Sequence, residues 1–256
     1  MKRTILKKAP LFLVLLLFSC SPDNATNENE TLTNSDSNNP NILETNSSRI
    51  SNTTTSKIWN FDDLTEWEDA TQIGNQNYWL ESGNLHIFTN PNTWERSKVK
   101  TISSFAAGTY RWNVYIPEMG VGDMASIGAF LYNNDSHELD FEIGYGTQSI
   151  RDQLAAQSDD LILYMTSQGN PFQSAAMKIK RGQWYNLTLE LTLTSNGRYK
   201  VSWKINDAIM ATVQLTYGKR TKFNIYCSVE NLQFIGDHIP QSQNYALFDA
   251  VEFKAN

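Results

Sequence analysis

Short stretches in which hydrophobic and polar residues alternate follow one another from about residue 57 to residue 256. A period of two sends successive side chains to opposite faces, which is typical of half-buried β-strands. The clearest example is 137–143, where Leu139, Phe141 and Ile143 share the apolar face. Strands of this kind are predicted over 83–88, 97–101, 110–116, 127–132, 137–143, 161–166, 184–194, 199–205, 208–215, 222–229 and 246–253.

Turn residues separate these strands, and helical periodicity is weak throughout. Ser195-Asn196-Gly197 and Ile205-Asn206-Asp207 have the composition of hairpin turns. The one helical candidate, 150–156, is expected to be a loop with a helical turn. Many short strands with tight turns and few helices predict a single all-β domain of about 200 residues, folded as a β-sandwich.

The polar face of 137–143 carries three carboxylates, Glu138, Asp140 and Glu142. Neighbours on one face of a strand lie ~6.6 Å apart, so their charges repel and at least one pKa should rise. An acidic outer face is one interpretation of this row, and a cleft that performs acid–base chemistry is the other. A retaining glycosidase needs two carboxyl groups ~5–5.5 Å apart. The α-carbons of Glu138 and Glu142 would lie ~13 Å apart, so their side chains would have to lean towards each other.

The motif Glu138-Leu139-Asp140-Phe141-Glu142 resembles the E-x-D-x-E signature of family 16 glycoside hydrolases, the clan of the bacterial β-glucanases called lichenases. The resemblance implies that Glu138 is the nucleophile, Glu142 the general acid/base, and Asp140 the residue that tunes both. It also implies a concanavalin-like jelly roll of two antiparallel sheets. Weaker similarity to strands of that family covers 59–64, 108–117, 128–132, 184–190 and 247–253.

Candidate sugar-binding residues follow from the same resemblance and from the strand phase. Trp94 and Arg96 precede a strand where lichenases carry an aromatic residue and an arginine near the cleft, although Arg96 could equally be a surface charge. Phe130 and Tyr132 either stack on sugars or pack behind the site. Tyr226, on the polar phase of 222–229, lies either on the far side of the groove or on an exposed convex face. The chain departs from the lichenase pattern in 230–236, where a tryptophan is missing, and in 147–160. These departures leave the identity of the glucan open.

Catalysis by this motif needs no cofactor, and a metal enters only as a structural expectation. Asp249 and Gly83 fall where lichenases hold a structural calcium, although Asp249 could instead form a hydrogen bond at a strand edge. The three histidines, His86, His137 and His238, lack the spacing of a metal-binding motif.

The first residues have the features of a bacterial lipoprotein leader. In 1–19, four basic residues precede an apolar run that is too short to span a bilayer, and Leu17-Phe18-Ser19-Cys20 looks like a lipobox. Cys20 would then be lipidated, and 20–56, rich in Asn, Thr and Ser, would be a flexible tether to a catalytic domain over 57–256. The alternative is an ordinary secretory signal. We expect a lipid-anchored protein of the cell envelope, at the outer membrane or cell surface of a bacterium.

Net charge and cysteine content limit the classes of partner that we expect. The formal net charge falls from −6 to −10 once the four cations of the leader are removed, which argues against nucleic acid. Cys227 would be the only cysteine left after lipidation of Cys20, and its position on the apolar phase predicts a buried thiol. We expect a monomer that binds a polysaccharide.

Three hypotheses on function follow, and they differ in class. The first is a retaining, endo-acting hydrolase of a β-linked, glucan-type polysaccharide, which the intact carboxylate motif favours. The second is a glycan-binding surface lipoprotein built on the same sandwich. The third is a jelly-roll polysaccharide lyase, which would need a Tyr or His base beside a neutralising cation. Product analysis on a panel of polysaccharides separates the three.

Overall fold

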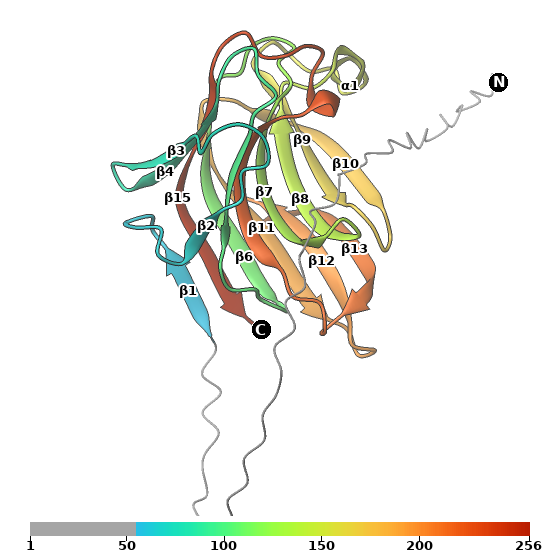
Figure 1. The fold of residues 1–256 in the computed structure, drawn as a ribbon. Helices are drawn as coiled ribbons and strands as arrows, with labels where there is room; N and C mark the ends of the chain where they lie inside the picture. The colour runs from blue at the N-terminus through green and yellow to red at the C-terminus, as the bar shows by residue number, and fades with distance from the viewer. Residues whose placement is uncertain (1–54) are drawn as a thin grey trace, which may run out of the picture. The chain divides into compact units, whose positions relative to one another are not determined.

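The structure, a computed structural model, describes residues 55–256; the predicted leader, Cys20 and most of the tether lie outside the described residues. Two antiparallel sheets form a sandwich, which confirms the predicted all-β fold (Figure 1). The first sheet follows the order β13 (Ala208–Gly218), β12 (Arg198–Ile205), β11 (Gln183–Leu193), β6 (Gly108–Ile116), β15 (Asn244–Ala255), β4 (Asn84–Thr89) and β3 (Tyr78–Glu81), and β1 (Ser56–Trp59) also pairs with β15. The second follows the order β10 (Gln173–Lys180), β9 (Asp160–Ser167), β8 (His137–Gly144), β7 (Ala125–Asn134), β14 (Asn224–Asn231), β5 (Arg96–Thr101) and β2 (Trp67–Asp69).

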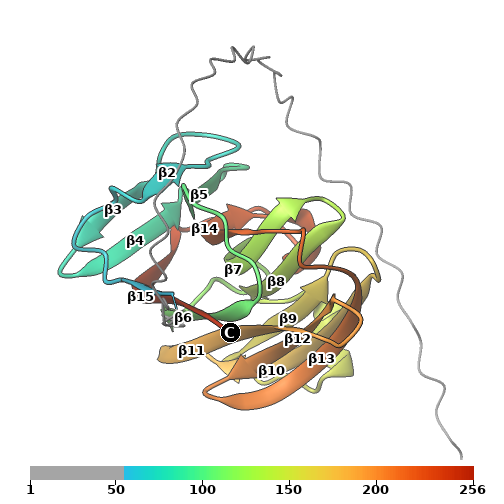
Figure 2. The ribbon, with the colours of Figure 1, turned by 90° about the horizontal axis from the view of Figure 1, so that it is seen from below.

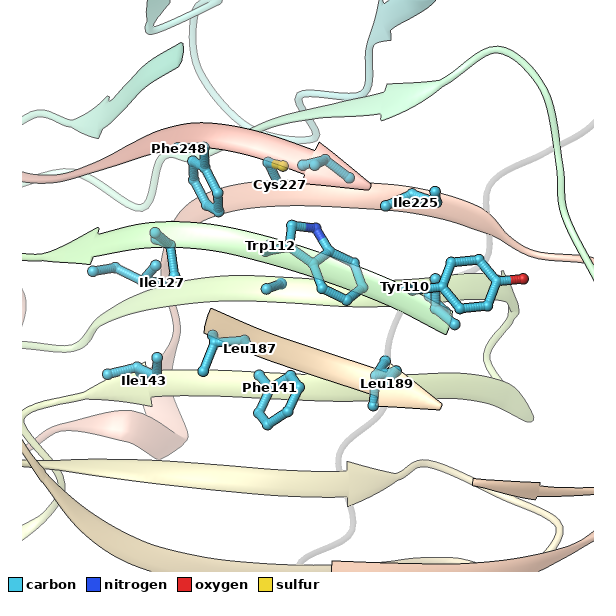
Figure 3. Packing of buried hydrophobic residues seen from close by; sticks show 14 of the residues in the cluster. Tyr110, Trp112, Ile127, Phe141, Ile143, Leu187, Leu189, Ile225, Cys227 and Phe248 are labelled. Atoms are coloured by element: carbon cyan, nitrogen blue, oxygen red, sulfur yellow. The ribbon is translucent and has the colours of Figure 1, made fainter. Parts of the chain in front are cut away.

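The hydrophobic core lies between the two sheets, where the apolar phase of each strand meets that of the opposite layer (Figures 2 and 3). Trp112 of β6 and Phe141 of β8 are fully buried there. The indole Nε1 of Trp112 donates a hydrogen bond of 3.0 Å to the carbonyl of Tyr226 in β14, which ties one sheet to the other. Cys227 is buried in the same core, as its phase predicts.

Each of the eleven predicted strands has a counterpart in the structure. The alternation of apolar and polar residues did not predict the edge strands β10, β3 and β2. β10 presents mostly exposed side chains at the end of its sheet, so it lacks the alternation that marks a half-buried strand. β3 and β2 are edge strands of four and three residues. Strands this short leave too few positions to establish a period.

Helical structure in the described residues is limited to α1 (Gln148–Gln153) and the single 3-10 turn η1 (Gln233–Ile235). α1 begins two residues before the predicted helical turn because Thr147 caps it, with the Thr147 hydroxyl accepting from the backbone N–H of Ile150. Neither helix within 55–256 is long and apolar enough to cross a membrane.

Candidate active site

The three carboxylates of the motif project from β8 on the face that points away from the first sheet. β8 lies inside the second sheet, between β7 and β9. Its apolar residues Leu139, Phe141 and Ile143 are completely buried in the core, so the alternate residues lie on the other face. From the first sheet, Trp203 Nε1 donates a hydrogen bond of 2.8 Å to the backbone carbonyl of Asp140, which fixes the middle of the strand.

Strand register decides which side chains share this face, because directly paired residues of antiparallel strands project to the same side. In β7 the partners of Glu138, Asp140 and Glu142 are Tyr132, Phe130 and Gly128. Across β14, β5 and β9 the same face carries Tyr226, Ser228, Glu230, Arg96, Lys98, Tyr164 and Thr166. The polar phase of 222–229, which the sequence could assign to either face of the sandwich, therefore lies beside the carboxylates.

The carboxylates are sheltered and hydrogen-bonded. Asp140 is 1% exposed and Glu142 is 8% exposed. Ser126 Oγ donates to Glu142 Oε2, and Gln168 Nε2 donates to Asp140 Oδ2 over 2.8 Å. The side chain of Asp140 also lowers the pKa of Glu138. A network of this kind holds each carboxylate in one orientation.

Gly128 makes room for the Glu142 carboxylate. A Cβ at this position would lie 3.2 Å from Glu142 Oε1 and 2.4 Å from Ser228 Oγ. The first distance is a tight contact and the second is a clash. The absence of a side chain on the central strand β7 is therefore what allows Glu142 to lie flat across the sheet.

A fourth acid, Glu230 of β14, lies on the same face of the second sheet and is paired with two cations. Glu230 is 2% exposed, and its Oε2 accepts from Arg96 Nε at 2.6 Å and from Lys98 Nζ at 2.9 Å. Lys98 is itself buried and donates a further bond of 3.1 Å to Gln72 Oε1. The sequence analysis did not select Lys98 or Glu230 as site residues. Their alternating phase was visible, but their pairing joins strands more than 130 residues apart.

Burial and these charges act differently on the acids. Burial raises the pKa of Glu138 to about 7, against the opposing effect of the Lys98 ammonium. Burial also raises the pKa of Glu142 to about 8, and the negative charge of Glu230 adds to this rise. For Glu230, burial acts in the same direction, but Lys98 and Arg96 outweigh it and hold the pKa below its ordinary value. Glu230 is thus held as an anion, whereas burial favours the protonated forms of Glu138 and Glu142.

The aromatic residues predicted to bind sugars differ in their exposure to solvent. Phe130 and Tyr226 are buried and stack on each other, with ring centroids 4.6 Å apart and planes at 15°. Tyr132 meets Tyr226 edge-on and donates from its hydroxyl to Asp135 Oδ1 over 2.8 Å. Trp94, by contrast, is 45% exposed. It lines a hollow of about 310 Å³ with Ile73, Arg96, Asn231, Leu232 and Gln233.

Phe234 takes part in the site where the lichenase tryptophan is missing. It lies on η1 and packs edge-on against Tyr164, with ring centroids 6.0 Å apart. Tyr164 is the strand partner of Glu142. The segment 230–236 therefore places a phenylalanine against Tyr164, the strand neighbour of Glu142.

The two residues predicted to hold calcium lie elsewhere, in the first sheet. Asp249 accepts a hydrogen bond of 2.8 Å from Asn113 Nδ2, and Gly83 occupies the turn between β3 and β4. Among residues 55–256 no group of three or more His, Cys, Asp or Glu side chains could hold a metal ion. One carboxylate is a poor match to the six to eight oxygens that calcium takes. Calcium at Asp249 and Gly83 stays a prediction, and no step below depends on it.

Solved structures share this fold. No protein-family model matches the sequence, and no curated protein matches it either. The structure aligns with the Crh5 transglycosylase at a TM-score of 0.58 and 11% identity, over 78% of this chain and 84% of the enzyme. It aligns with the Bacillus licheniformis β-glucanase at 0.55 and 14%, over 80% and 100%. A Bacteroides ovatus family 16 enzyme, solved with a mixed-linkage glucan product, aligns at 0.53 and 12%, over 77% and 99%. The chain thus has the jelly-roll fold of family 16 glucanases and transglycosylases.

Proposed function

We propose that the domain is a retaining, endo-acting glycoside hydrolase that cleaves a β-linked, glucan-type polysaccharide by double displacement. The observation that carries the proposal is the placement of Glu138, Asp140 and Glu142 on one sheltered face of β8, where burial raises the pKa of both glutamates. A retaining glycosidase requires one ionised and one protonated carboxyl group. The shared fold of glucanases supports the choice of substrate class.

Two chemical steps follow from these roles. The ionised Glu138 attacks the anomeric carbon, while Glu142 gives its proton to the departing glycosidic oxygen, so a glycosyl–Glu138 ester forms and the glycosidic bond breaks. Glu142, now a carboxylate, takes a proton from water, and this water attacks the anomeric carbon and releases Glu138. Asp140 lowers the pKa of Glu138 and so favours the ionised form of the nucleophile. A sugar hydroxyl in place of water would give transglycosylation, which product analysis detects.

Substitution of each acid tests the assignment. Glu138→Gln should abolish turnover, because no nucleophile remains, and Glu142→Gln should reduce kcat on a polysaccharide by about 10²–10⁴-fold. An aryl glycoside leaves without protonation, so Glu142→Gln should retain much more activity on that substrate. Glu68→Gln is the matched control, since Glu68 lies on the edge strand of the same sheet and is exposed. Full activity of Glu138→Gln on the best glucan would overturn the proposal.

A second candidate function is glycan binding without turnover, and the burial of the carboxylates favours it. Asp140 and Glu142 are almost inaccessible, whereas the hollow at Trp94 and Arg96 borders β5, three strands away from β8 in the second sheet. A glycan that occupied this hollow would contact Trp94 and Arg96 and leave the acids untouched. Retained binding with no products from a broad panel of β-glucans would select this function.

We propose the cell envelope as the location, with the domain held by acyl chains on Cys20. Several chains on one cysteine give stable membrane attachment, which a single chain does not. The resulting enzyme would act on polysaccharides that reach the surface on which it is anchored.

A further inference from the structure

A continuous row of large side chains crosses the outer face of the first sheet. The register pairs Trp79 with His86, His86 with Leu247, Leu247 with Tyr115, and Tyr115 with Trp184. The residues that alternate with them, such as Ile87 and Val114, are buried in the core, so the row faces away from the second sheet. We call these five residues, with Phe88 and Tyr245 beside them, the aromatic row.

The aromatic row runs across β3, β4, β15, β6 and β11, which lie side by side in one layer (Figure 2). Adjacent strands are about 4.8 Å apart, so five strands span about 19 Å. That is long enough to hold several sugars of an extended chain. The rings stand on strands rather than on loops, so their positions are set by the sheet.

Contacts between the rings hold the side chains of the row in place. Trp79 lies over His86 with centroids 4.0 Å apart and planes at 35°, and its indole contacts Phe88 at 5.2 Å. Glu81 accepts from Trp79 Nε1 at 3.3 Å and lies 3.3 Å from His86 Nδ1, which fixes both rings. At the far end Trp184 and Tyr115 are in contact at 5.5 Å.

Both ends of the aromatic row remain open to solvent. Trp79 is 41% exposed and Trp184 is 44% exposed. His86, Leu247 and Tyr115 between them are partly exposed, so the row forms a contiguous surface patch, and such a patch marks an interaction site.

Charge decides the kind of partner. Two cations of this outer face are already paired, Arg111 with Asp207 at 2.8 Å and Lys204 with Glu190 at 2.8 Å. The polar groups next to the rings are carboxylate and amide groups, including Glu81, Asn113 and Asp249. An anionic membrane or an acidic polysaccharide would meet these carboxylates, whereas a neutral sugar chain stacks its C–H faces on the rings and donates hydroxyls to the oxygens.

We propose that the aromatic row is a second binding site for a neutral β-linked polysaccharide chain, on the side of the sandwich opposite to the carboxylates. The class of ligand rests on the proposed function, because it assumes that the site and the row engage the same polymer. Two contacts on one long chain raise the effective concentration of the substrate at the cleft. Short oligosaccharides, which cannot engage both, would gain nothing from the row.

The test uses the full chain with Glu138→Gln, so that a polymer is bound but not consumed. Retardation in gels that contain soluble mixed-linkage β-glucan or laminarin measures binding. Trp79→Ala with Trp184→Ala should weaken retardation by at least about tenfold. The matched control is Ile209→Ala, which removes an apolar side chain that is even more exposed, from β13 of the same sheet. In the Glu138-containing chain, the double alanine variant should hydrolyse a short soluble oligosaccharide at an unchanged rate and the polymer more slowly.

The outcomes separate this inference from the proposed function. Retardation that persists in the double variant, or that depends only on Trp94, overturns the second site and leaves the hydrolase proposal standing. Retardation lost in the double variant, while the chain with Glu138 intact releases no products from the same glucans, supports the second site and refutes the hydrolase. If the double variant instead loses binding to anionic vesicles, the aromatic row binds a membrane. If it changes from dimer to monomer on a sizing column, the row binds a second copy of the chain. Either result would overturn the proposal that the row binds a polysaccharide.

Discussion

The two glutamates of β8 carry the same functional group but experience different surroundings, and this difference predicts a pH profile. Burial raises the pKa of Glu138 to about 7 and that of Glu142 to about 8. The nucleophile must be ionised and the acid must be protonated, so kcat/KM should rise with pH as Glu138 loses its proton and fall as Glu142 does. We expect a narrow maximum between the two values. A kcat/KM profile with its optimum near pH 5, below both pKa values, would contradict the assignment.

Glu230 is not one of the two reacting carboxyl groups, but its substitution should still change the pH profile of kcat/KM. Its negative charge raises the pKa of Glu142, so Glu230→Gln should lower that pKa and move the alkaline limb of kcat/KM to lower pH. Glu230→Gln also leaves Lys98 and Arg96 without their buried anion, which should cost about 3–5 kcal/mol of unfolding free energy. A residue with a purely structural role would lower stability without shifting the limb.

The double variant Lys98→Met with Glu230→Gln provides the control for this prediction. It removes the buried cation together with its partner, so its stability in denaturant should exceed that of Glu230→Gln alone. Lys98 lowers the pKa of Glu138 and Glu230 raises it, so the acidic limb should move less in the double variant than in a variant that lacks Lys98 alone. Equal stability of the single and double variants would show that Lys98 and Glu230 do not act as a pair.

At the scale of elements, the central strand β7 leaves space for Glu142 because Gly128 has no side chain. Gly128→Ala would place a Cβ 2.4 Å from Ser228 Oγ and 3.2 Å from Glu142 Oε1. We expect a loss of about 1–3 kcal/mol in unfolding free energy from the clash, together with a lower kcat as Glu142 is displaced. Thermal unfolding and kcat measure the two effects separately.

Removal of the Ser228 side chain tests whether the clash with its hydroxyl causes the loss of stability. Gly128→Ala with Ser228→Gly deletes the hydroxyl that the new Cβ meets, so stability should recover. The contact with Glu142 remains, so kcat should recover less than stability does. Complete recovery of both, or of neither, would show that Gly128 does not support Glu142 in this way.

The alternation of β8 was enough to place three carboxylates on one face, because a strand with a buried side leaves its polar residues no alternative. Sequence reasoning could not assemble the rest of the site, since that requires knowing which strands pair. β14 lies between β7 and β5, and only this order brings Glu230 beside Lys98 and Arg96. The aromatic row has the same origin, as Trp79 and Trp184 belong to strands far apart in the chain.

At the scale of the whole molecule, the two outer faces of the sandwich differ in chemistry while sharing one core. One face collects buried acids and their two cations, and the other collects aromatic rings that are partly exposed. Trp112 and Trp203 link the layers by hydrogen bonds to backbone carbonyls of the opposite sheet. The rigid core therefore keeps the two faces in a fixed relation, as simultaneous contact with one long glycan would require.

The lipid anchor predicted at Cys20 can be tested against the other cysteine of the chain. Full-length protein should sediment with membranes and be released by detergent, and Cys20→Ala should appear in the soluble fraction, because the acyl chains supply the attachment. Cys227→Ala is the control, since this thiol is buried in the core and should not affect partitioning. The released Cys20→Ala variant should hydrolyse soluble oligosaccharides at the same rate, because the candidate site lies entirely within residues 55–256. A Cys20→Ala chain that still sediments with membranes would refute the anchor and transfer the attachment to another part of the protein.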